Sequence, residues 1–325
     1  MKIGILGAGS LGSVFGGMLA EGGHSVTMLS RSQEYTETVN RQGLFLTEDA
    51  EGKEDRSTTV RATKEYAELA GSELLIVLVN SFGTREAAKA ALQAGAIGRE
   101  TAILTLQNGL GNEEILQEIA GKERVITGRT YVSGRMLSPG RVMAAVRGCL
   151  TEIGELDGAQ TERIRLVRDA FCQSGLETRI AGNIHSVIWE KLLVNVATGA
   201  ISGITGLDYG GLYEKYGFGA PRELREIACK AVAEAMKVAS AYQIPLSAVD
   251  PAEYWNRASK GQPPAFRASI LQSLERGHRT EIDTINGAVV LWGRRAGVDT
   301  PVNEALTACI KGIEFRMDQE RKKRG

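Results

Sequence analysis

The stretch IGILGAGSLG, residues 3–12, decides the fold that this sequence predicts. The apolar run Ile3–Leu6 is followed by Gly7-Ala8-Gly9-Ser10-Leu11-Gly12, which fits the pattern G-x-G-x-x-G. Because the chain has 39 glycines among 325 residues, a chance match is expected in roughly every second chain of this composition. The pattern alone therefore decides little, and its neighbours have to support it.

The residues that follow give this support. Residues 11–20 carry small and apolar side chains at helical spacing, and Ser25–Leu29 is typical of a second strand. A strand, a glycine loop, a helix and a strand within about 30 residues form the unit that places a pyrophosphate at a helix N-terminus. We therefore predict that Gly7–Gly12 binds a dinucleotide, with a tight turn that binds nothing as the alternative.

The first half of the chain continues as alternating strands and helices. Apolar runs at residues 74–79 and Ile103–Leu106 end at polar residues, as strands buried on both faces of a parallel sheet do. Between residues 124 and 153, short alternating stretches around Ser138-Pro139-Gly140 predict antiparallel strands that extend this sheet. The fold class is therefore α/β, with an N-terminal Rossmann-type doubly wound sheet.

The second half is predicted to be helical. Residues 183–207, 221–242, 280–296 and 301–317 carry apolar residues at three-and-four spacing, whereas residues 247–266 contain three prolines and resemble a loop with short helical pieces. We therefore expect a dinucleotide-binding Rossmann-type domain over residues 1–182. An all-helical domain over residues 183–325 would carry the substrate and catalysis.

Composition excludes several classes of protein. Apolar residues make up 43% and charged residues 24% of the chain, which is ordinary for a folded globular protein. The 39 Lys and Arg residues balance 39 Asp and Glu residues, so no overall positive field attracts nucleic acid or an anionic membrane. The longest aliphatic run, residues 74–79, is too short to span a bilayer. We expect no nucleic-acid or membrane partner, and a homodimer stays open.

The cysteines and the N-terminus bear on the compartment. Cys149, Cys172, Cys229 and Cys309 form no C-x-x-C pair and have no histidine cluster at zinc-like spacing, which favours buried reduced thiols and no metal site. Met1-Lys2 leads directly into an apolar strand instead of a signal peptide. We therefore expect a cytoplasmic protein.

The end of the second strand predicts which cofactor binds. An acidic residue there would accept a hydrogen bond from the ribose 2′-hydroxyl of NAD. This chain instead has Ser30-Arg31-Ser32, and an arginine suits the 2′-phosphate of NADPH. We predict that Arg31 binds this phosphate, with a solvated loop arginine as the alternative.

Two further motifs carry candidate polar groups. Gln107-Asn108-Gly109 follows a strand, at the edge of the sheet where open α/β folds bind ligands, although Asn-Gly is also a common turn. In the helix of residues 183–207, Lys191 and Asn195 are four residues apart and share one face of a mostly apolar stretch. A solvent-facing lysine and a capped asparagine are the structural alternative. Thr280 and Asp283 resemble a capping box at a helix start.

Together these motifs resemble the ketopantoate reductases, or 2-dehydropantoate 2-reductases. The resemblance covers nearly the whole chain: Gly7–Gly12, Gln107–Gly109, Trp189–Asn195, Thr280–Gly287 and Pro301–Glu304. It implies an enzyme that uses NADPH to reduce a 2-oxo acid, with ketopantoate reduced to pantoate in pantothenate biosynthesis as the expected reaction.

The resemblance also implies roles for single residues. The lysine that matches Lys191 donates the proton to the keto oxygen of the substrate, and the asparagine that matches Asn195 helps to hold the substrate. The serine that matches Ser269 holds the substrate carboxylate. The residues that match Asn108 and Glu281 line the cofactor and the reacting centre, Asn108 also on the substrate side.

Further positions complete the cofactor site or depart from the family. The backbone at Gly134 falls where the family's strand-end segment touches the cofactor, and Asn80 stands near the cofactor where the family usually has a lysine. Gly199 stands where the family usually has a second substrate asparagine. Because a mid-helix glycine costs roughly 0.5 to 1 kcal/mol relative to alanine, Gly199 indicates either close packing or room for a larger ligand.

Three alternatives stay open. The scaffold suits a reductase of another 2-oxo acid, and a non-catalytic dinucleotide-binding module would keep the fold without turnover. Lys191, Asn195, Ser269 and Glu281 together argue against the module, because a sensor has no use for a proton donor. An NAD-dependent β-hydroxyacid dehydrogenase would carry an acidic residue in place of Arg31.

Overall fold

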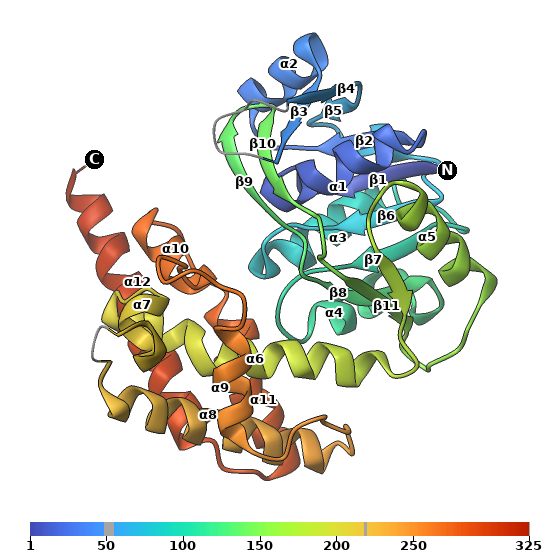
Figure 1. The fold of residues 1–325 in the computed structure, drawn as a ribbon. Helices are drawn as coiled ribbons and strands as arrows, with labels where there is room; N and C mark the ends of the chain where they lie inside the picture. Colours follow the sequence, from blue (N-terminus) through green and yellow to red (C-terminus); the bar gives the residue numbers. More distant parts are fainter. Residues whose placement is uncertain (49–54, 218–219, 325) are drawn as a thin grey trace. The chain divides into compact units, whose positions relative to one another are not determined.

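The computed structural model describes residues 1–48, 55–217 and 220–324. The chain divides into two compact units, one of residues 1–107 with 111–187 and one of residues 108–110 with 188–325. The last division falls inside a continuous helix, and the predicted boundary after residue 182 stays a prediction. The predicted α/β class is confirmed, with a Rossmann-like sheet in the first unit and helices in the second (Figure 1).

The first unit is built on an eight-stranded sheet. Its strand order is β12-β11-β8-β7-β6-β1-β2-β5, and neighbours are parallel except for β8 and β11. The strands are β1 Lys2–Leu6, β2 Ser25–Leu29, β5 Arg61–Thr63, β6 Leu74–Val77, β7 Ala102–Thr105, β8 Val125–Thr130, β11 Thr151–Glu155 and β12 Thr178–Ile180.

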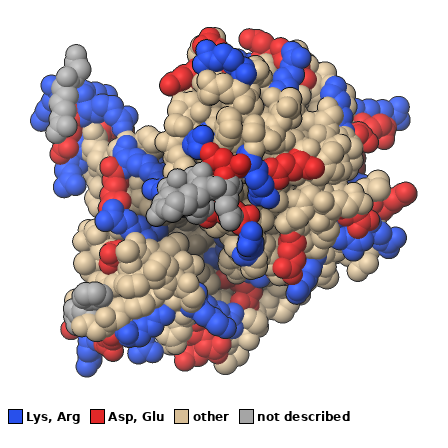
Figure 2. Space-filling view, turned by 45° about the horizontal axis from the view of Figure 1, so that its top comes forward, with Lys and Arg blue, Asp and Glu red and all other residues tan. Residues whose placement is uncertain are grey.

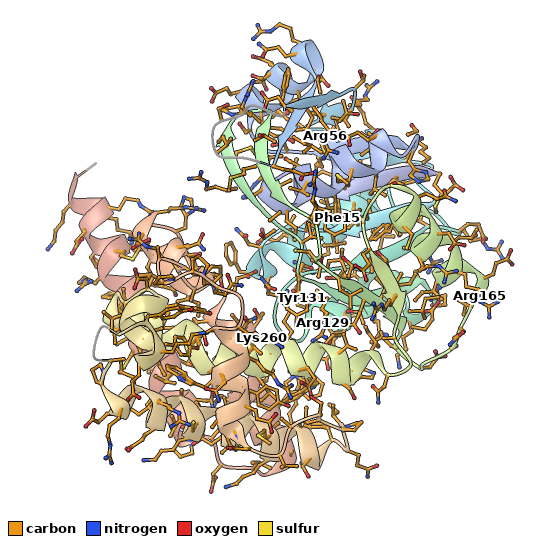
Figure 3. The ribbon with its side chains drawn as sticks, in the orientation of Figure 1. Phe15, Arg56, Arg129, Tyr131, Arg165 and Lys260 are labelled. Carbon is orange, nitrogen blue, oxygen red and sulfur yellow. The ribbon has the colours of Figure 1, made fainter. Side chains whose placement is uncertain are left out.

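Helices cover both faces of this sheet. They are α1 Ser10–Glu21, α2 Gln33–Gln42, α3 Thr84–Gln93, α4 Asn112–Ala120 and α5 Glu162–Gln173, with short 3-10 turns η1 Tyr66–Leu69, η2 Ser81–Gly83 and η3 Lys122–Arg124. Side chains of β1 alternate between the two layers: Ile3 and Ile5 pack in the core with Phe15 of α1, whereas Leu6 packs in the core with α3 and α4. Figure 3 labels Phe15, whose ring packs against that of Phe171 on α5 with the two ring centroids 5.5 Å apart.

A second sheet differs from the prediction. Strands β8 and β11 extend the large sheet, but the hairpin between them does not. It forms a four-stranded sheet of order β4-β3-β10-β9, with β3 Leu44–Thr47, β4 Arg56–Thr58, β9 Ser133–Ser138 and β10 Arg141–Ala145. The physical reason is that α1 is buried on two sides. Leu46 of β3 packs so closely on Gly17 that a Cβ there would lie 2.8 Å from it.

The second unit contains helices and 3-10 turns in its described residues. They are α6 Ile184–Thr205, whose first residues belong to the first unit, α7 Tyr209–Leu212, η4 Glu214–Tyr216, α8 Arg222–Ala241, α9 Pro251–Ala258, α10 Ser269–Glu275, η5 Ile282–Thr284, α11 Asn286–Ala296 and α12 Pro301–Arg324. By length and composition alone, α6 could cross a membrane, but 67% of its most apolar window is buried inside the protein, as in a core helix.

Two local expectations are wrong. No helix starts at Thr280: the 3-10 turn η5 Ile282–Thr284 follows it, and α11 begins only at Asn286. The capping box does not form, because Asp283 pairs with Lys311 and Arg279.

The prediction that the cysteines are buried is also wrong. Cys172 and Cys309 are exposed, and the other two are only half-buried. Within the described residues, no group of three or more His, Cys, Asp or Glu side chains could hold a metal ion.

Candidate cofactor and catalytic sites

The glycine loop after β1 has the geometry that a pyrophosphate needs. Gly7 has a φ of +105°, and a Cβ there would lie 2.7 Å from the backbone nitrogen of Val79. A Cβ on Gly12 would lie 2.0 Å from the Gly7 carbonyl oxygen, so this glycine lets α1 begin directly against the loop. Gly9 differs, because a Cβ there would meet nothing within 4 Å. The loop is closed at its two ends and open in the middle, where a ligand can approach the backbone.

The sheet topology places this loop at a switch point. From β1 the chain proceeds to β2 on one side and later returns to β6 on the other, so the loops after β1 and β6 lie at the edge where open α/β sheets bind ligands. The Leu78 N–H donates to the Leu6 carbonyl (2.8 Å), which continues the β1–β6 ladder to this edge. The exposed Asn80 is two residues after Leu78.

Two other predicted cofactor residues lie around the same loop. The Ala8 N–H donates to the Leu29 carbonyl (2.9 Å), which ties the glycine loop to the end of β2, two residues before the exposed Arg31. On the other side, a Cβ on Gly134 would lie 2.8 Å from Val14 and 3.0 Å from the Ser10 carbonyl oxygen. The structure therefore brings Gly134 against the first turn of α1.

Gln107 has a structural role that sequence reasoning missed. Its Nε2 donates to the Val79 carbonyl (2.6 Å) and to Thr84 Oγ1 (2.7 Å), and Thr84 Oγ1 donates to Asn112 (3.0 Å). The side chain therefore fastens the loop after β6 to the loop after β7. An amide side chain directly after a buried strand was the available signal.

Residues 108–110 pack with the helical unit. The Leu110 N–H donates to the Thr284 carbonyl (2.9 Å), and a Cβ on Gly109, whose φ is +84°, would lie 2.3 Å from that oxygen. The Thr284 N–H in turn donates to the Glu281 carbonyl (3.1 Å). The structure therefore brings the backbone segment of Asn108 and the turn that carries Glu281 together.

Helix α6 presents the predicted catalytic pair. Lys191 and Asn195 are both half-buried and lie one turn apart, beside the fully buried Leu192 and Leu193. The role of Lys191 as proton donor stays a prediction.

Gly199 continues the same helix stripe and favours close packing over room for a ligand. A Cβ on Gly199 would lie 3.1 Å from Ile270, and one on Gly203 would lie 2.7 Å from the same side chain. Ile270 is the second residue of α10, and the exposed Ser269 is the first. These two glycines therefore dock the helix start that carries Ser269 onto the helix of Lys191 and Asn195.

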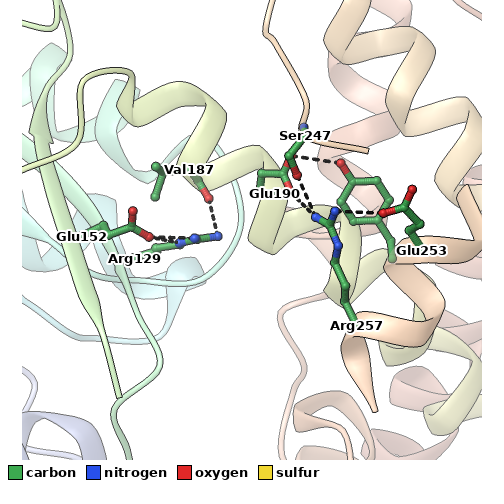
Figure 4. Close-up of polar contacts among 8 residues, drawn as sticks. Arg129, Glu152, Val187, Glu190, Ser247, Glu253 and Arg257 are labelled. Atoms are coloured by element: carbon green, nitrogen blue, oxygen red, sulfur yellow. Dashed lines mark hydrogen bonds and ion pairs between the residues drawn. The ribbon is translucent and has the colours of Figure 1, made fainter. Parts of the chain in front are cut away.

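The residue before Lys191 is fixed by a network that sequence reasoning missed (Figure 4). Glu190 accepts hydrogen bonds from the Ser247 N–H (2.5 Å), the Tyr254 hydroxyl (3.1 Å) and Arg257 (2.7 Å). The Arg257 guanidinium also lies 5.0 Å from the Tyr254 ring centroid. Burial and the Glu190 carboxylate raise the pKa of Tyr254 to about 12. The sequence predicts residues 247–266 as a loop with short helical pieces, which α9 Pro251–Ala258 confirms, but no sequence signal links this segment to α6.

A second group of polar residues is structural. Asn286 donates to Asn303 (2.9 Å), and both side chains are fully buried. Glu234 of α8 accepts hydrogen bonds from the Val302 and Asn303 N–H groups (2.9 and 3.0 Å) at the start of α12. These motif asparagines therefore join α8, α11 and α12.

The first unit contains its own polar pair at the end of β8. Arg129 pairs with Glu152 (2.7 Å) and donates to the Val187 carbonyl (3.1 Å) in the first turns of α6 (Figure 4). Its guanidinium also lies 5.2 Å from the ring centroid of Tyr131, the next residue but one (Figure 3). These contacts anchor the beginning of α6 to the sheet.

Comparison with known proteins gives matches along nearly the full chain. Residues 3–158 match the family described as "Ketopantoate reductase PanE/ApbA", and residues 183–314 match "Ketopantoate reductase PanE/ApbA C terminal". The 2-dehydropantoate 2-reductase of Pyrococcus horikoshii is 33% identical over 314 residues, which cover 97% of this chain and 98% of that protein. The enzyme of the same name from Halobacterium salinarum is 33% identical over 316 residues, 96% of this chain and 98% of that protein.

Two solved structures are similar over the same length. The PanE/ApbA family ketopantoate reductase from Ralstonia eutropha JMP134 is 30% identical with a TM-score of 0.85, covering 98% of this chain and 100% of that chain. A D-mandelate dehydrogenase in complex with NADH and anilino(oxo)acetate is 25% identical with a TM-score of 0.86 and the same coverage.

Proposed function

This chain belongs to the ketopantoate reductase family of oxidoreductases, and from that premise we propose that it uses NADPH to reduce 2-dehydropantoate (ketopantoate) to pantoate. The observation that carries the proposal is the half-buried pair Lys191 and Asn195 on α6, with Ser269 docked onto the same helix through Gly199. This is a proton donor, an amide and a hydroxyl on two packed helices, which suits a small acid with a keto group.

The proposed cofactor site uses the loops at the carboxyl edge of the sheet. Gly7–Gly12 would hold the pyrophosphate, with Arg31 at the 2′-phosphate and Asn80 and Gly134 beside the loop. The open space at Gly9 supports this assignment, because a bound phosphate needs direct access to the backbone. Asn108 and Glu281 would line the cofactor near the reacting centre. When bound, the nicotinamide supplies the hydride for reduction of the keto carbon.

The proposed catalytic roles follow from charge and hydrogen-bonding capacity. Lys191 carries three donor hydrogens as an ammonium ion and would give one proton to the keto oxygen as negative charge develops there. Asn195 and Asn108 would donate amide hydrogens to the substrate, and Ser269 would donate its hydroxyl hydrogen to the carboxylate. These neutral partners orient an anionic substrate without placing another charge beside Lys191.

A second candidate is reduction of another 2-oxo acid on the same scaffold. The similarity to a D-mandelate dehydrogenase favours it, because that structure holds NADH and anilino(oxo)acetate, a 2-oxo acid other than ketopantoate. Gly199 also favours another substrate, because it stands where the family usually has an asparagine and so removes one polar group from this face of α6.

A substrate panel tests the proposal. Oxidation of NADPH is followed by absorbance with ketopantoate, with phenylglyoxylate (the 2-oxo acid that corresponds to mandelate) and with small aliphatic 2-oxo acids. We expect the highest kcat/KM for ketopantoate. If another 2-oxo acid exceeds it tenfold, the second candidate replaces the substrate named here. If no 2-oxo acid is reduced, the non-catalytic dinucleotide-binding module is the remaining interpretation.

We further propose a cytoplasmic enzyme with domains at residues 1–182 and 183–325, without metal or nucleic-acid partner, and a homodimer stays open. Charges of both signs are interspersed on the face shown in Figure 2, without one large patch of a single sign. This pattern supports a small-molecule substrate held by local groups. All four cysteines are free thiols, which fits a reducing compartment.

A further inference from the structure

We propose that Lys64 is a second cation for the 2′-phosphate of NADPH, beside Arg31, and so a further residue that determines cofactor specificity. This inference rests on the proposed function, because it requires NADPH to bind at the edge of the sheet next to the glycine loop. It concerns a residue that no motif in the sequence singled out.

The backbone brings the two cations to one place. Strands β2 and β5 are parallel neighbours at the end of the large sheet, with Leu29 opposite Thr63. The Ser30 N–H donates to the Thr63 carbonyl (2.9 Å), so the ladder continues to the last residues of both strands. Beyond the strand ends, Lys64 therefore lies opposite Ser30, and Arg31 is the residue after Ser30. Both cations therefore leave the same edge of the sheet next to each other.

The Lys64 ammonium has a neutral partner. Its Nζ donates to Gln33 Oε1 (3.0 Å), and Gln33 is the first residue of α2, two residues after Arg31. An amide oxygen does not compensate the positive charge. Arg31 forms no ion pair with the residues that the structure describes. Among the described residues, neither cation is therefore held by a carboxylate.

Arg61 makes the contrast clear. It begins β5, the strand that Lys64 follows, but its guanidinium pairs with Glu68 through Nε (2.8 Å) and a terminal nitrogen (2.7 Å). Its charge is therefore already matched. Lys64 and Arg61 are both exposed, so they differ chiefly in whether a carboxylate holds them.

Open space beside Lys64 lets it change partner. A cavity of about 360 Å³ lies between α2 and β5, and Gln33, Thr36, Arg61 and Lys64 are among the residues that line it. The ammonium can therefore turn from Gln33 to a phosphate oxygen without displacing a packed side chain. The charged phosphate is the stronger acceptor of the two.

Acidic neighbours limit the range of the attraction. Glu34 and Glu65 are exposed next to the two strand ends, and Glu37 accepts a hydrogen bond from the Gln33 amide (2.6 Å). Their charges offset the two cations at a distance, so Lys64 cannot attract NADPH by its long-range field. Its effect depends on direct contact with the phosphate, which NADH lacks.

Fluorescence titration of the full chain with NADPH and with NADH tests the inference. Lys64→Gln should raise the Kd for NADPH about three- to fivefold and change that for NADH less than twofold, the upper part of the range expected for an exposed ion pair. Lys64→Arg should keep most of the NADPH affinity. Arg61→Gln is the matched control, because Arg61 is three residues away, equally exposed and loses the same charge, and it should leave both constants within twofold.

The outcomes separate this inference from the proposed cofactor. If wild type binds NADPH more tightly than NADH and Arg31→Ala removes this preference but Lys64→Gln does not, Lys64 has no part in phosphate binding and the inference is wrong. If Lys64→Gln and Arg61→Gln weaken NADPH equally, the effect is general electrostatics and the inference is also wrong. A wild type that prefers NADH overturns both the inference and the proposed cofactor.

Discussion

The edge of the sheet around Gly7–Gly12 and the helix stripe of Lys191 and Asn195 are built in different ways. The first is made of backbone, shaped by glycines whose neighbours lie within a few residues or on the adjacent strand. The second is made of side chains, and the groups that fix it come from segments far along the chain, such as Arg257, which is 67 residues from Glu190. A backbone site can therefore be predicted from short sequence spacings, whereas a side-chain site depends on how helices far apart in the sequence pack.

The largest effect is expected at the side-chain site. Lys191→Ala should lower kcat by a factor of about 10² to 10⁴, the range for loss of a positioned general acid, while NADPH still binds. Lys237→Ala, an exposed lysine on α8, is the control and should leave turnover unchanged. Steady-state kinetics and cofactor titration decide it. Turnover of Lys191→Ala within threefold of wild type would remove this residue from the proposed chemistry.

A pair of alanine substitutions tests the backbone site. Gly9→Ala adds a methyl group into open space, so the variant should fold like wild type but bind NADPH roughly a hundredfold more weakly, because the methyl occupies the approach to the loop. Gly12→Ala forces a contact with the Gly7 carbonyl and should lower the free energy of unfolding by about 1 to 3 kcal/mol. Titration and urea unfolding measure both. Equal stability losses would contradict the division of roles between the two glycines.

One buried carboxylate in the first unit should make the free energy of unfolding depend on pH. Glu113, in the first turn of α4, is buried, and this burial raises its pKa from 4.5 to about 7. Because the folded-state pKa lies above the unfolded value, the folded state favours the protonated acid. The free energy of unfolding should therefore fall as pH rises from about 4.5 through about 7.

Glu113→Gln should remove this loss, so that the variant gains about 2 kcal/mol relative to wild type between pH 5 and pH 8. Urea unfolding at both pH values measures it, with Glu86→Gln, an exposed glutamate in the first turn of α3, as control. A parallel pH dependence of Glu113→Gln and wild type would show that this carboxylate does not titrate in that range.

The smallest effect concerns the network behind Lys191. Arg257→Ala leaves the Glu190 carboxylate, 15% exposed, without its cation and should cost about 1 kcal/mol of stability, a value reduced because Arg257 is 35% exposed. Arg222→Ala breaks the exposed pair with Glu226 and should cost less than about 0.5 kcal/mol. If the two variants lose equal stability, the network contributes no more than a surface pair.

This difference explains what the sequence could and could not predict. Strands β1 and β2, the glycine loop and the helix with Lys191 follow from local spacing, because each pattern lies within one element. The separate sheet of β9 and β10 did not follow, because its pairing with β3 depends on covering α1. The capping box predicted at Thr280 does not form for a similar reason, since Asp283 forms an ion pair with Lys311 on α12. The Glu190 network could not be predicted either, because its partners lie on α9 and in the segment before it, more than 50 residues along the chain.

The tripeptide Asn108–Leu110 has a consequence for how this enzyme can be taken apart. Because it belongs with the helices although it follows β7, the backbone changes unit after Gln107, after Leu110 and after Val187. A chimera cut once after Val187 would keep this tripeptide with the N-terminal half of one relative, whereas the rest of the helical unit would come from the other relative. Its Leu110 N–H and Gly109 backbone would then face a foreign residue in place of Thr284. An exchange of helical halves between relatives should therefore transfer this tripeptide as well.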